Sequence, residues 1–191
     1  MKITECLDHF SEDLAGTSIA VPEKTTLFRT ATSVLGMAQA YESDGRTFLA
    51  SGDTVNALAS FWYGLGWLHF GYTYGLLVTP GRSPCPFASP FETLPVAYRK
   101  RLVEKTERYD RLLNLARSSV VPASAAETAA YDVAERILCI ADAYSRAGEW
   151  VMKEGRWEDA LSCFSYGHGW LDAAVTSGLF RIVAEHDLFT V

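Results

Sequence analysis

The sequence lacks the patterns that mark most metal sites and enzymes. It has four cysteines without a Cys-x-x-Cys pair, which favours free thiols in a reducing cytoplasm over a zinc site or a disulfide scaffold. Its histidines lack the His-x-x-x-His and Glu-x-x-His spacings of helical di-metal sites. Phosphate-loop, dinucleotide-binding and Gly-x-Ser-x-Gly motifs are also missing. We therefore assign no catalytic residue, metal or cofactor.

Positive charge is in the minority: the chain has 17 lysine and arginine residues against 23 aspartate and glutamate residues, which gives a net charge of −6 at pH 7. An acidic protein is a poor nonspecific binder of nucleic acid. The exception is a basic run from Tyr98 to Arg117, where Lys100/Glu104, Glu104/Arg108 and Glu107/Arg111 have the spacing of ion pairs on one helix. We expect this run to form a solvated helix face with internal pairing.

Segments that could direct the chain to a membrane are not evident either. Acidic residues near the start, such as Glu5 and Asp8, argue against a signal peptide. The uncharged stretch between Asp53 and Arg82 is interrupted by His69 and by glycines, so we expect a buried helix there and a cytoplasmic protein.

The main feature that is present is an internal repeat. Residues 40–77 recur without a gap as residues 143–180, and the shared positions include the run Tyr-Gly-x-Gly-Trp-Leu. Helical periodicity extends the duplication to the first helix of each unit, and prolines lie between the periodic stretches. No window alternates as a strand does, so no sheet is expected.

These patterns predict an all-α fold. Each unit should be a three-helix up-and-down hairpin, and the two should pack about a pseudo-twofold axis as a bundle of about six helices. We expect a first repeat at 1–78, a proline-rich linker at 79–95 and a second repeat at 96–191. The later helices are expected at 23–51, 53–78, 125–154 and 156–185, with a capping box at Ser124 and Glu127. Gly52 and Gly155 should end the second helices in the left-handed conformation, and Asp53 should cap the third.

The third helix of each unit carries small residues along one side. We interpret this stripe as a helix-packing motif with tryptophan anchors beside it, whose polar ends bond to the backbone. Its members are Gly64, Trp67, Gly71, Gly75, Gly167, Trp170 and Gly178.

Gly52-Asp53, Tyr63 and Gly66-Trp67-Leu68, echoed by Gly169-Trp170-Leu171-Asp172-Ala173, resemble an archaeal family catalogued as domain-of-unknown-function family 357. The resemblance covers the last two helices of each unit. It implies a three-helix bundle in tandem duplication and an archaeal cytosolic source, and it brings no catalytic residues. His69 stands where the family pattern prefers Asp.

The two copies differ on the face opposite the small stripe. The second copy shows Ser165, Gly169, Asp172 and Thr176, a polar face expected to meet water. The first copy has an aromatic and imidazole face in the same place. Two explanations stand: the linker folds over this face through Phe87 or Phe91, or the face binds a ligand or partner. The residues of that candidate site are Trp62, Gly66, His69 and Tyr72.

Three functions are compatible with the sequence. The preferred one is a nonenzymatic helical interaction or scaffold module with a protein partner and a possible homodimeric state. The second is a nucleic-acid-associated protein or helical ribonuclease using Arg181 and His186, expected at a helix end, or the basic helix from Arg99 to Arg117; the Arg181/His186 spacing is at chance frequency. The third is a small-molecule binder with a pocket between the bundles.

Overall fold

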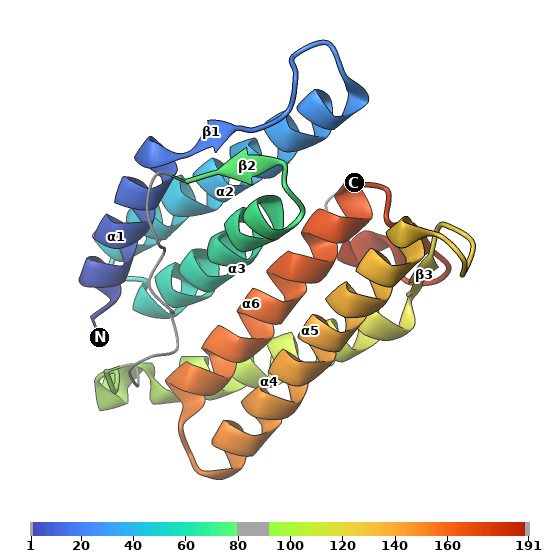
Figure 1. The fold of residues 1–191 in the computed structure, drawn as a ribbon. Helices are drawn as coiled ribbons and strands as arrows, with labels where there is room; N and C mark the ends of the chain where they lie inside the picture. The colour runs from blue at the N-terminus through green and yellow to red at the C-terminus, as the bar shows by residue number, and fades with distance from the viewer. Residues whose placement is uncertain (1, 80–91, 190–191) are drawn as a thin grey trace.

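The computed structural model describes residues 2–79 and 92–189 of the chain, and the predicted all-α bundle is confirmed (Figure 1). Within these residues the first repeat contributes three α-helices, and the second contributes three more in the same order. The helices are α1 (Ile3–Gly16), α2 (Thr26–Ala50), α3 (Thr54–Thr73), α4 (Arg99–Ser118), α5 (Ala129–Lys153) and α6 (Trp157–Thr176). Short 3-10 helices, η1 (Val96–Tyr98) and η2 (His186–Leu188), precede α4 and follow α6.

Threonine hydroxyls start the second helix of each unit. The Thr25 hydroxyl oxygen accepts a hydrogen bond from the Phe28 amide at 3.1 Å, and that of Thr128 accepts one from the Tyr131 amide at 3.2 Å. These caps satisfy amides that have no carbonyl partner within the helix. The predicted capping box at Ser124 was wrong, because Thr128 holds the cap and α5 begins after it.

The junction between the second and third helices follows the sequence prediction. Gly52 and Gly155 have φ values of +79° and +78°, the left-handed conformation that ends a helix. Asp53 then caps α3 by accepting a hydrogen bond from the Asn56 amide at 3.2 Å. Arg156 stands at the corresponding place before α6 and provides no side-chain cap.

The third helices end earlier than predicted. Gly75 and Gly178 lie beyond α3 and α6 with φ values of +74° and +77°. A Cβ atom on either would have no neighbour within 4 Å, so these two glycines end helices and do not belong to the packing stripe. The amides of Leu76 and Leu179 donate back to Gly71 and Ala174, which closes the last turn.

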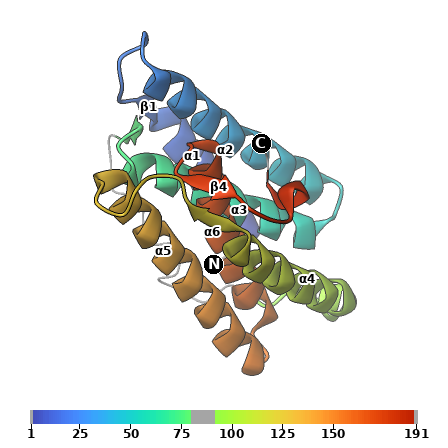
Figure 2. The ribbon, with the colours of Figure 1, turned by 90° about the vertical axis from the view of Figure 1, so that its right-hand side faces the viewer.

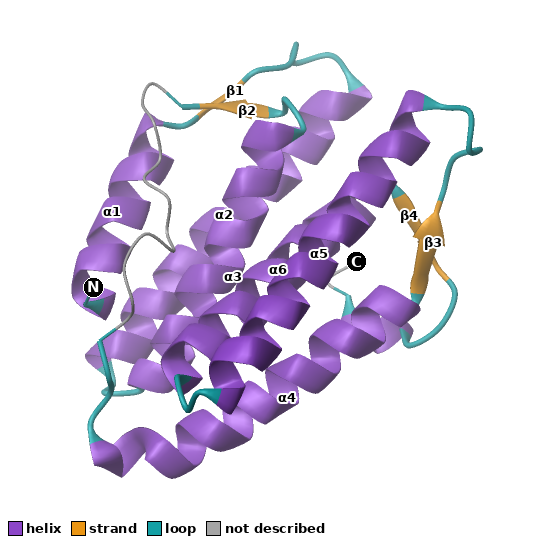
Figure 3. Ribbon diagram, turned by 60° about the horizontal axis from the view of Figure 1, so that its bottom comes forward, coloured by secondary structure: helices purple, strands orange, loops and turns teal. Residues whose placement is uncertain are grey.

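Short antiparallel ladders follow, although no sheet was expected. In the first repeat β1 (Ser18–Ile19) pairs with β2 (Leu77–Val78), and in the second β3 (Val120–Pro122) pairs with β4 (Phe180–Ile182). Each ladder joins the chain leaving the first helix to the chain leaving the third (Figure 3). Strands this short have no alternation that a sequence pattern could reveal.

The helices α3 and α6 form the centre of the molecule, with α2 packed on α3 and α5 packed on α6 (Figure 2). The principal core runs continuously through both repeats, so the two units share one interior. Among its fully buried large side chains are Phe10, Trp62, Trp67, Phe70 and Leu161.

The two central helices cross at a pair of repeat-related glycines. A Cβ atom on Gly66 would lie 2.6 Å from the Tyr166 carbonyl oxygen and 3.1 Å from the Gly169 Cα. On Gly169, it would overlap the Tyr63 carbonyl oxygen and lie 3.3 Å from the Gly66 Cα. The contacts therefore exchange between repeats, as required at an approximate twofold axis through this crossing.

Candidate functional site

Three of the four residues predicted to form a one-sided site lie at the buried contact of α3 with α6, whereas the hydroxyl of the fourth, Tyr72, is hydrogen-bonded to Thr17 of its own repeat. Trp62 is 1% exposed and packs edge-on against Tyr166, with ring centroids 6.2 Å apart. Gly66 is at the crossing itself, and His69 and Tyr72 are partly buried. The second repeat therefore covers much of this face. Phe87 and Phe91, the other predicted cover, lie outside the described residues.

Two repeat-related tyrosines each form a hydrogen bond with a side chain of the other repeat. The Tyr63 hydroxyl donates a hydrogen bond to Asp172 Oδ2 at 2.7 Å, and the repeat-related Tyr166 hydroxyl lies 2.7 Å from His69 Nδ1. Burial, together with the charge of Asp172, raises the pKa of Tyr63 well above its usual range, so the phenol stays protonated and donates. Burial lowers the pKa of His69 to about 4, so that the imidazole is neutral at pH 7. The tyrosines thus bond to side chains across the interface rather than to the backbone.

The polar face predicted to meet water in the second copy is instead buried, which corrects that expectation. Two of its members, Ser165 and Asp172, are 0% exposed. His168, another residue of α6, is 4% exposed. Neither ring nitrogen of His168 has a hydrogen-bond partner of good geometry among the described residues. Burial lowers the pKa of His168, and the negative charge of Asp172 partly offsets this by raising it. Within the same residues, the indole nitrogens of Trp67 and Trp170 also lack the backbone partners that were expected.

The remaining stripe glycines do lie at close contacts inside each repeat. A Cβ atom on Gly64 would lie 2.7 Å from the Tyr41 Cβ, and one on Gly71 would lie 2.5 Å from the Leu77 Cδ1. The distance from a Cβ on Gly167 to the Tyr144 Cβ would be 3.1 Å. Gly64 and Gly167 therefore hold α3 against α2 and α6 against α5.

Arg181 and His186, the residues of the ribonuclease hypothesis, do not lie at the end of the third α-helix as expected. Arg181 is in strand β4 opposite Val121, and His186 opens the 3-10 helix η2. The helix that was expected to reach this region ends at Thr176.

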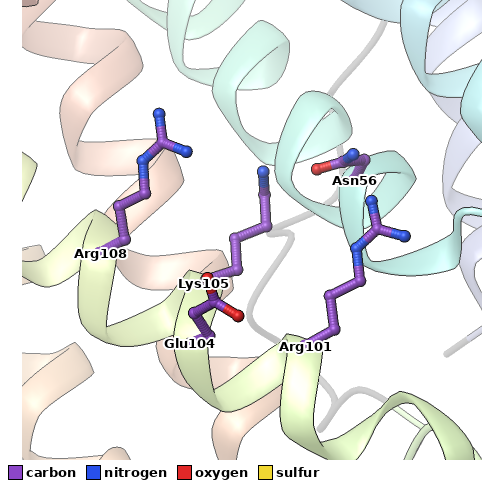
Figure 4. A pocket seen from close by; sticks show the side chains of 5 residues that line it. All are labelled: Asn56, Arg101, Glu104, Lys105 and Arg108. Atoms are coloured by element: carbon purple, nitrogen blue, oxygen red, sulfur yellow. The ribbon is translucent and has the colours of Figure 1, made fainter.

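A cleft between the repeats brings polar side chains together. It has a volume of about 230 Å³ and lies between the first turn of α3 and the N-terminal half of α4. In Figure 4 the side chains of Arg101 and Lys105 extend from α4 toward the turn of α3 that carries Asn56, and Arg108 extends on the far side of Lys105. Glu104 is the other residue of the lining. We call this set of five residues the cationic cleft.

Asp53 fixes the α3 side of the cationic cleft. Its carboxylate caps the Asn56 amide and also accepts hydrogen bonds from Asn56 Nδ2 at 2.6 Å and from Arg101 Nη2 at 2.5 Å. The Asp53 carboxylate thus orients the side-chain amide of Asn56. It also neutralises Arg101 and thereby joins α4 to α3.

The other two cations of the cleft, Lys105 and Arg108, differ from Arg101. Among the residues that the structure describes, neither Lys105 nor Arg108 forms an ion pair. The predicted pairs Lys100/Glu104, Glu104/Arg108 and Glu107/Arg111 do not form within 4.0 Å, so the expectation of internal pairing was wrong. The Lys105 ammonium instead lies 4.9 Å from the centroid of the Tyr109 ring, in a cation–π contact one turn along α4.

The pKa of Lys105 is lowered, as expected for a partly buried cation without an ion-pair partner. Burial lowers the pKa of Lys105, the neighbouring Arg108 and Arg101 lower it further, and Asp53 acts in the opposite direction. An anion placed between Lys105 and Arg108 would reduce the repulsion and replace lost hydration. The arrangement can therefore hold a carboxylate or a phosphate group.

The cationic cleft belongs to one copy only. The corresponding positions of the first helix are Lys2, Cys6 and His9, and Asn56 corresponds to Asp159 in the second repeat. The sequence shows that these residue types differ between the copies, but it does not show that α4 and the start of α3 lie together.

Comparison with protein families gives two matches to one model, described as "Protein of unknown function (DUF357)", at residues 7–77 and 108–180. Together the matches span well over half of the chain. The chain belongs to the DUF357 family. The second DUF357 segment begins at Arg108, so the family model covers neither Arg101 nor Lys105. Two of the three cations of the cleft are thus outside the part shared with the family model.

No curated protein and no solved structure matches this DUF357 chain. Among the described residues, no cluster of three or more histidine, cysteine or acidic side chains could hold a metal ion. None of the helices in that part of the chain is both long and apolar enough to cross a bilayer.

Proposed function

We propose that this DUF357 chain is a nonenzymatic helical interaction module that binds an acidic side chain of a partner protein in its cationic cleft. One observation carries the proposal: Lys105 and Arg108 line a cleft and form no ion pair with any residue that the structure describes, on a protein whose net charge is −6. Cations held together without compensation favour binding of an anion supplied from outside.

The size of the cleft favours a group on a larger partner. Pockets that enclose a whole small ligand usually have volumes of about 300 to 1,000 Å³. At about 230 Å³, the cationic cleft fits one side chain or one acid group better than a complete metabolite. The rest of the ligand would then lie outside, over the exposed surface of α4.

The charge distribution favours a protein partner over nucleic acid. A polyanion gains affinity by neutralising many cations, and each contact adds to the salt dependence. Here Arg101 is already paired with Asp53, and Glu104 places a negative charge on the rim. A single carboxylate matches the two uncompensated cations, whereas a long phosphate backbone would meet an acidic protein on either side.

The same proposal includes the setting of the protein. The repeats at 1–78 and 96–191 would act as one unit, because Asn56 and α4 come from different repeats. We place the protein in the cytoplasm of an archaeon on the family resemblance. Cys6, Cys139 and Cys163 are unpaired, in keeping with a reducing compartment.

Fluorescence anisotropy with a labelled hexaglutamate peptide tests the proposal. The double variant Lys105→Gln/Arg108→Gln should weaken binding by about tenfold or more, since it removes both uncompensated charges. The matched control, Lys100→Gln/Arg111→Gln, makes the same charge change on the same helix outside the cleft and should alter binding far less. Equal losses in the two variants would reduce the effect to net charge and refute the site.

A labelled hexauridylate RNA serves as the competing probe. We expect it to bind more weakly than the peptide at the same salt concentration. Tighter binding of RNA that depends on Lys105 and Arg108 would overturn the assignment of a protein partner.

A further inference from the structure

A second, mostly apolar pocket lies between the repeats, away from the cationic cleft. It has a volume of about 340 Å³ and is formed by the end of α3 and the first half of α5. The residues that line it are Thr73, Tyr74, Val133, Arg136, Ile137 and Ile140. An apolar pocket of this size with few polar groups has the general character of a small-molecule site.

Arg136 is the charged residue in this lining. It is exposed, and it makes no ion pair or hydrogen bond within the residues that the structure describes. At the other wall, the amides of Tyr74, Gly75 and Leu76 donate to carbonyls in the last turn of α3 and close it. The pocket thus offers an apolar floor with one available guanidinium at its rim.

The Tyr74 ring forms the α3 side of the floor. It stacks on the buried Phe70, with ring centroids 5.3 Å apart and planes tilted by 31°. Ile137 is buried at the opposite wall, and Val133 and Ile140 are partly buried one turn to each side. The apolar walls are therefore held by the core and do not need a ligand to form.

The corresponding surface of the other repeat is polar. Four of its six positions carry hydroxyl side chains, and a serine replaces the arginine. The corresponding residues are Thr30, Ser33, Val34, Met37, Thr176 and Ser177. The apolar lining and its cation therefore occur in one copy only. Shared helix packing does not account for that difference, because both copies form the same helices.

We propose that this pocket binds a small organic monocarboxylate with an apolar body. The apolar part would lie against Val133, Ile137 and Ile140, where it gains free energy by leaving water. The carboxylate would pair with Arg136, whose planar fork accepts two carboxylate oxygens side by side. The proposal is independent of the cationic cleft, since the two linings share no residue.

Titration calorimetry of the full chain with octanoate tests the inference, with octylammonium as a probe of the same length and opposite charge. Octanoate should bind saturably at one site, and octylammonium should bind at least about tenfold more weakly, as loss of a charged hydrogen bond implies. Arg136→Gln should weaken octanoate binding by about tenfold and leave the unfolding midpoint unchanged. Ser33→Gln, at the corresponding place in the first repeat, should leave octanoate binding unchanged.

Three results would overturn the inference. They are the lack of saturable octanoate binding, equal affinity for the two probes, and an Arg136→Gln variant that binds octanoate as tightly as the original chain. A loss of equal size in Ser33→Gln would also contradict the assignment to this pocket.

Discussion

The Tyr63 hydroxyl of the first repeat donates a hydrogen bond to Asp172 of the second repeat over 2.7 Å, in a fully buried position. Its repeat-related counterpart joins Tyr166 to His69 over the same distance. The two bonds lie on either side of the Gly66/Gly169 crossing, so a tandem duplication has produced an interface with the exchanged contacts of a symmetric dimer. The halves differ at one partner, where a neutral imidazole takes the place of a carboxylate.

The crossing glycines should tolerate no side chain. Gly66→Ala would bring a Cβ to 2.6 Å from the Tyr166 carbonyl oxygen, and backbone cannot move aside as a flexible side chain can. We expect a loss of about 2 to 3 kcal/mol in the free energy of unfolding, measured by urea denaturation. Gly36→Ala in α2 is the matched control, because its Cβ would meet nothing within 4 Å. That variant should be neutral or more stable by up to about 1 kcal/mol.

The packing glycines inside the repeats should differ from each other. Gly64→Ala places its Cβ 2.7 Å from the Tyr41 Cβ, whereas Gly167→Ala leaves 3.1 Å to the Tyr144 Cβ. Gly64→Ala should therefore lower the melting temperature more than Gly167→Ala, and leucine at either position should cost several kcal/mol through overpacking. Melting temperatures that equal the original in both leucine variants would show that these helices are not closely packed.

Much of the fold was predictable because the determining signals are local. The repeat, the helix-ending Gly52 and the capping Asp53 act within a few residues, and each was predicted correctly. The face of α3 that meets α6 was not identified. A helix buried on nearly all sides has no amphipathic period to show which side faces another helix and which faces water. The same holds for α6, so Ser165 and Asp172 were assigned to a solvated face.

The cationic cleft was missed for a different reason. Arg101 is neutralised by Asp53, which lies far away in the sequence, whereas the pairs predicted for α4 were local. Local spacing shows which charges could meet on one helix, and tertiary structure decides which of them do. The unpaired state of Lys105 and Arg108 could only be seen after α3 and α4 had been placed together.

Acid should destabilise the interface between the repeats. Burial lowers the pKa of His69 from 6.5 to about 4, so the unfolded chain binds more protons between these values. This contribution to stability is complete above about pH 6.5 and is lost as the pH falls toward 4, by roughly 3 kcal/mol in all. His168 acts in the same direction. Urea denaturation at a series of pH values from 7 to 4 measures the loss.

Removing the imidazole assigns that loss to His69. His69→Gln keeps an acceptor for the Tyr166 hydroxyl and does not titrate, so its stability should fall less between pH 6.5 and 4. His9→Gln, at an exposed position of α1, should follow the original chain. If His69→Gln follows the original chain as well, the protonation of His69 is not linked to folding.

The most direct test of the cationic cleft uses the side-chain amide of Asn56, observed by nuclear magnetic resonance during titration with hexaglutamate. The chain has two asparagines, Asn56 and Asn114, and one glutamine, Gln39, so few such signals occur and each can be assigned. Asn114 donates to Asp110 on α4, outside the cleft, and is the internal control. A saturable shift of the Asn56 signals alone, lost in Lys105→Gln/Arg108→Gln, is the predicted result. Unchanged Asn56 signals, or the same shift in the double variant, would contradict anion binding in the cationic cleft.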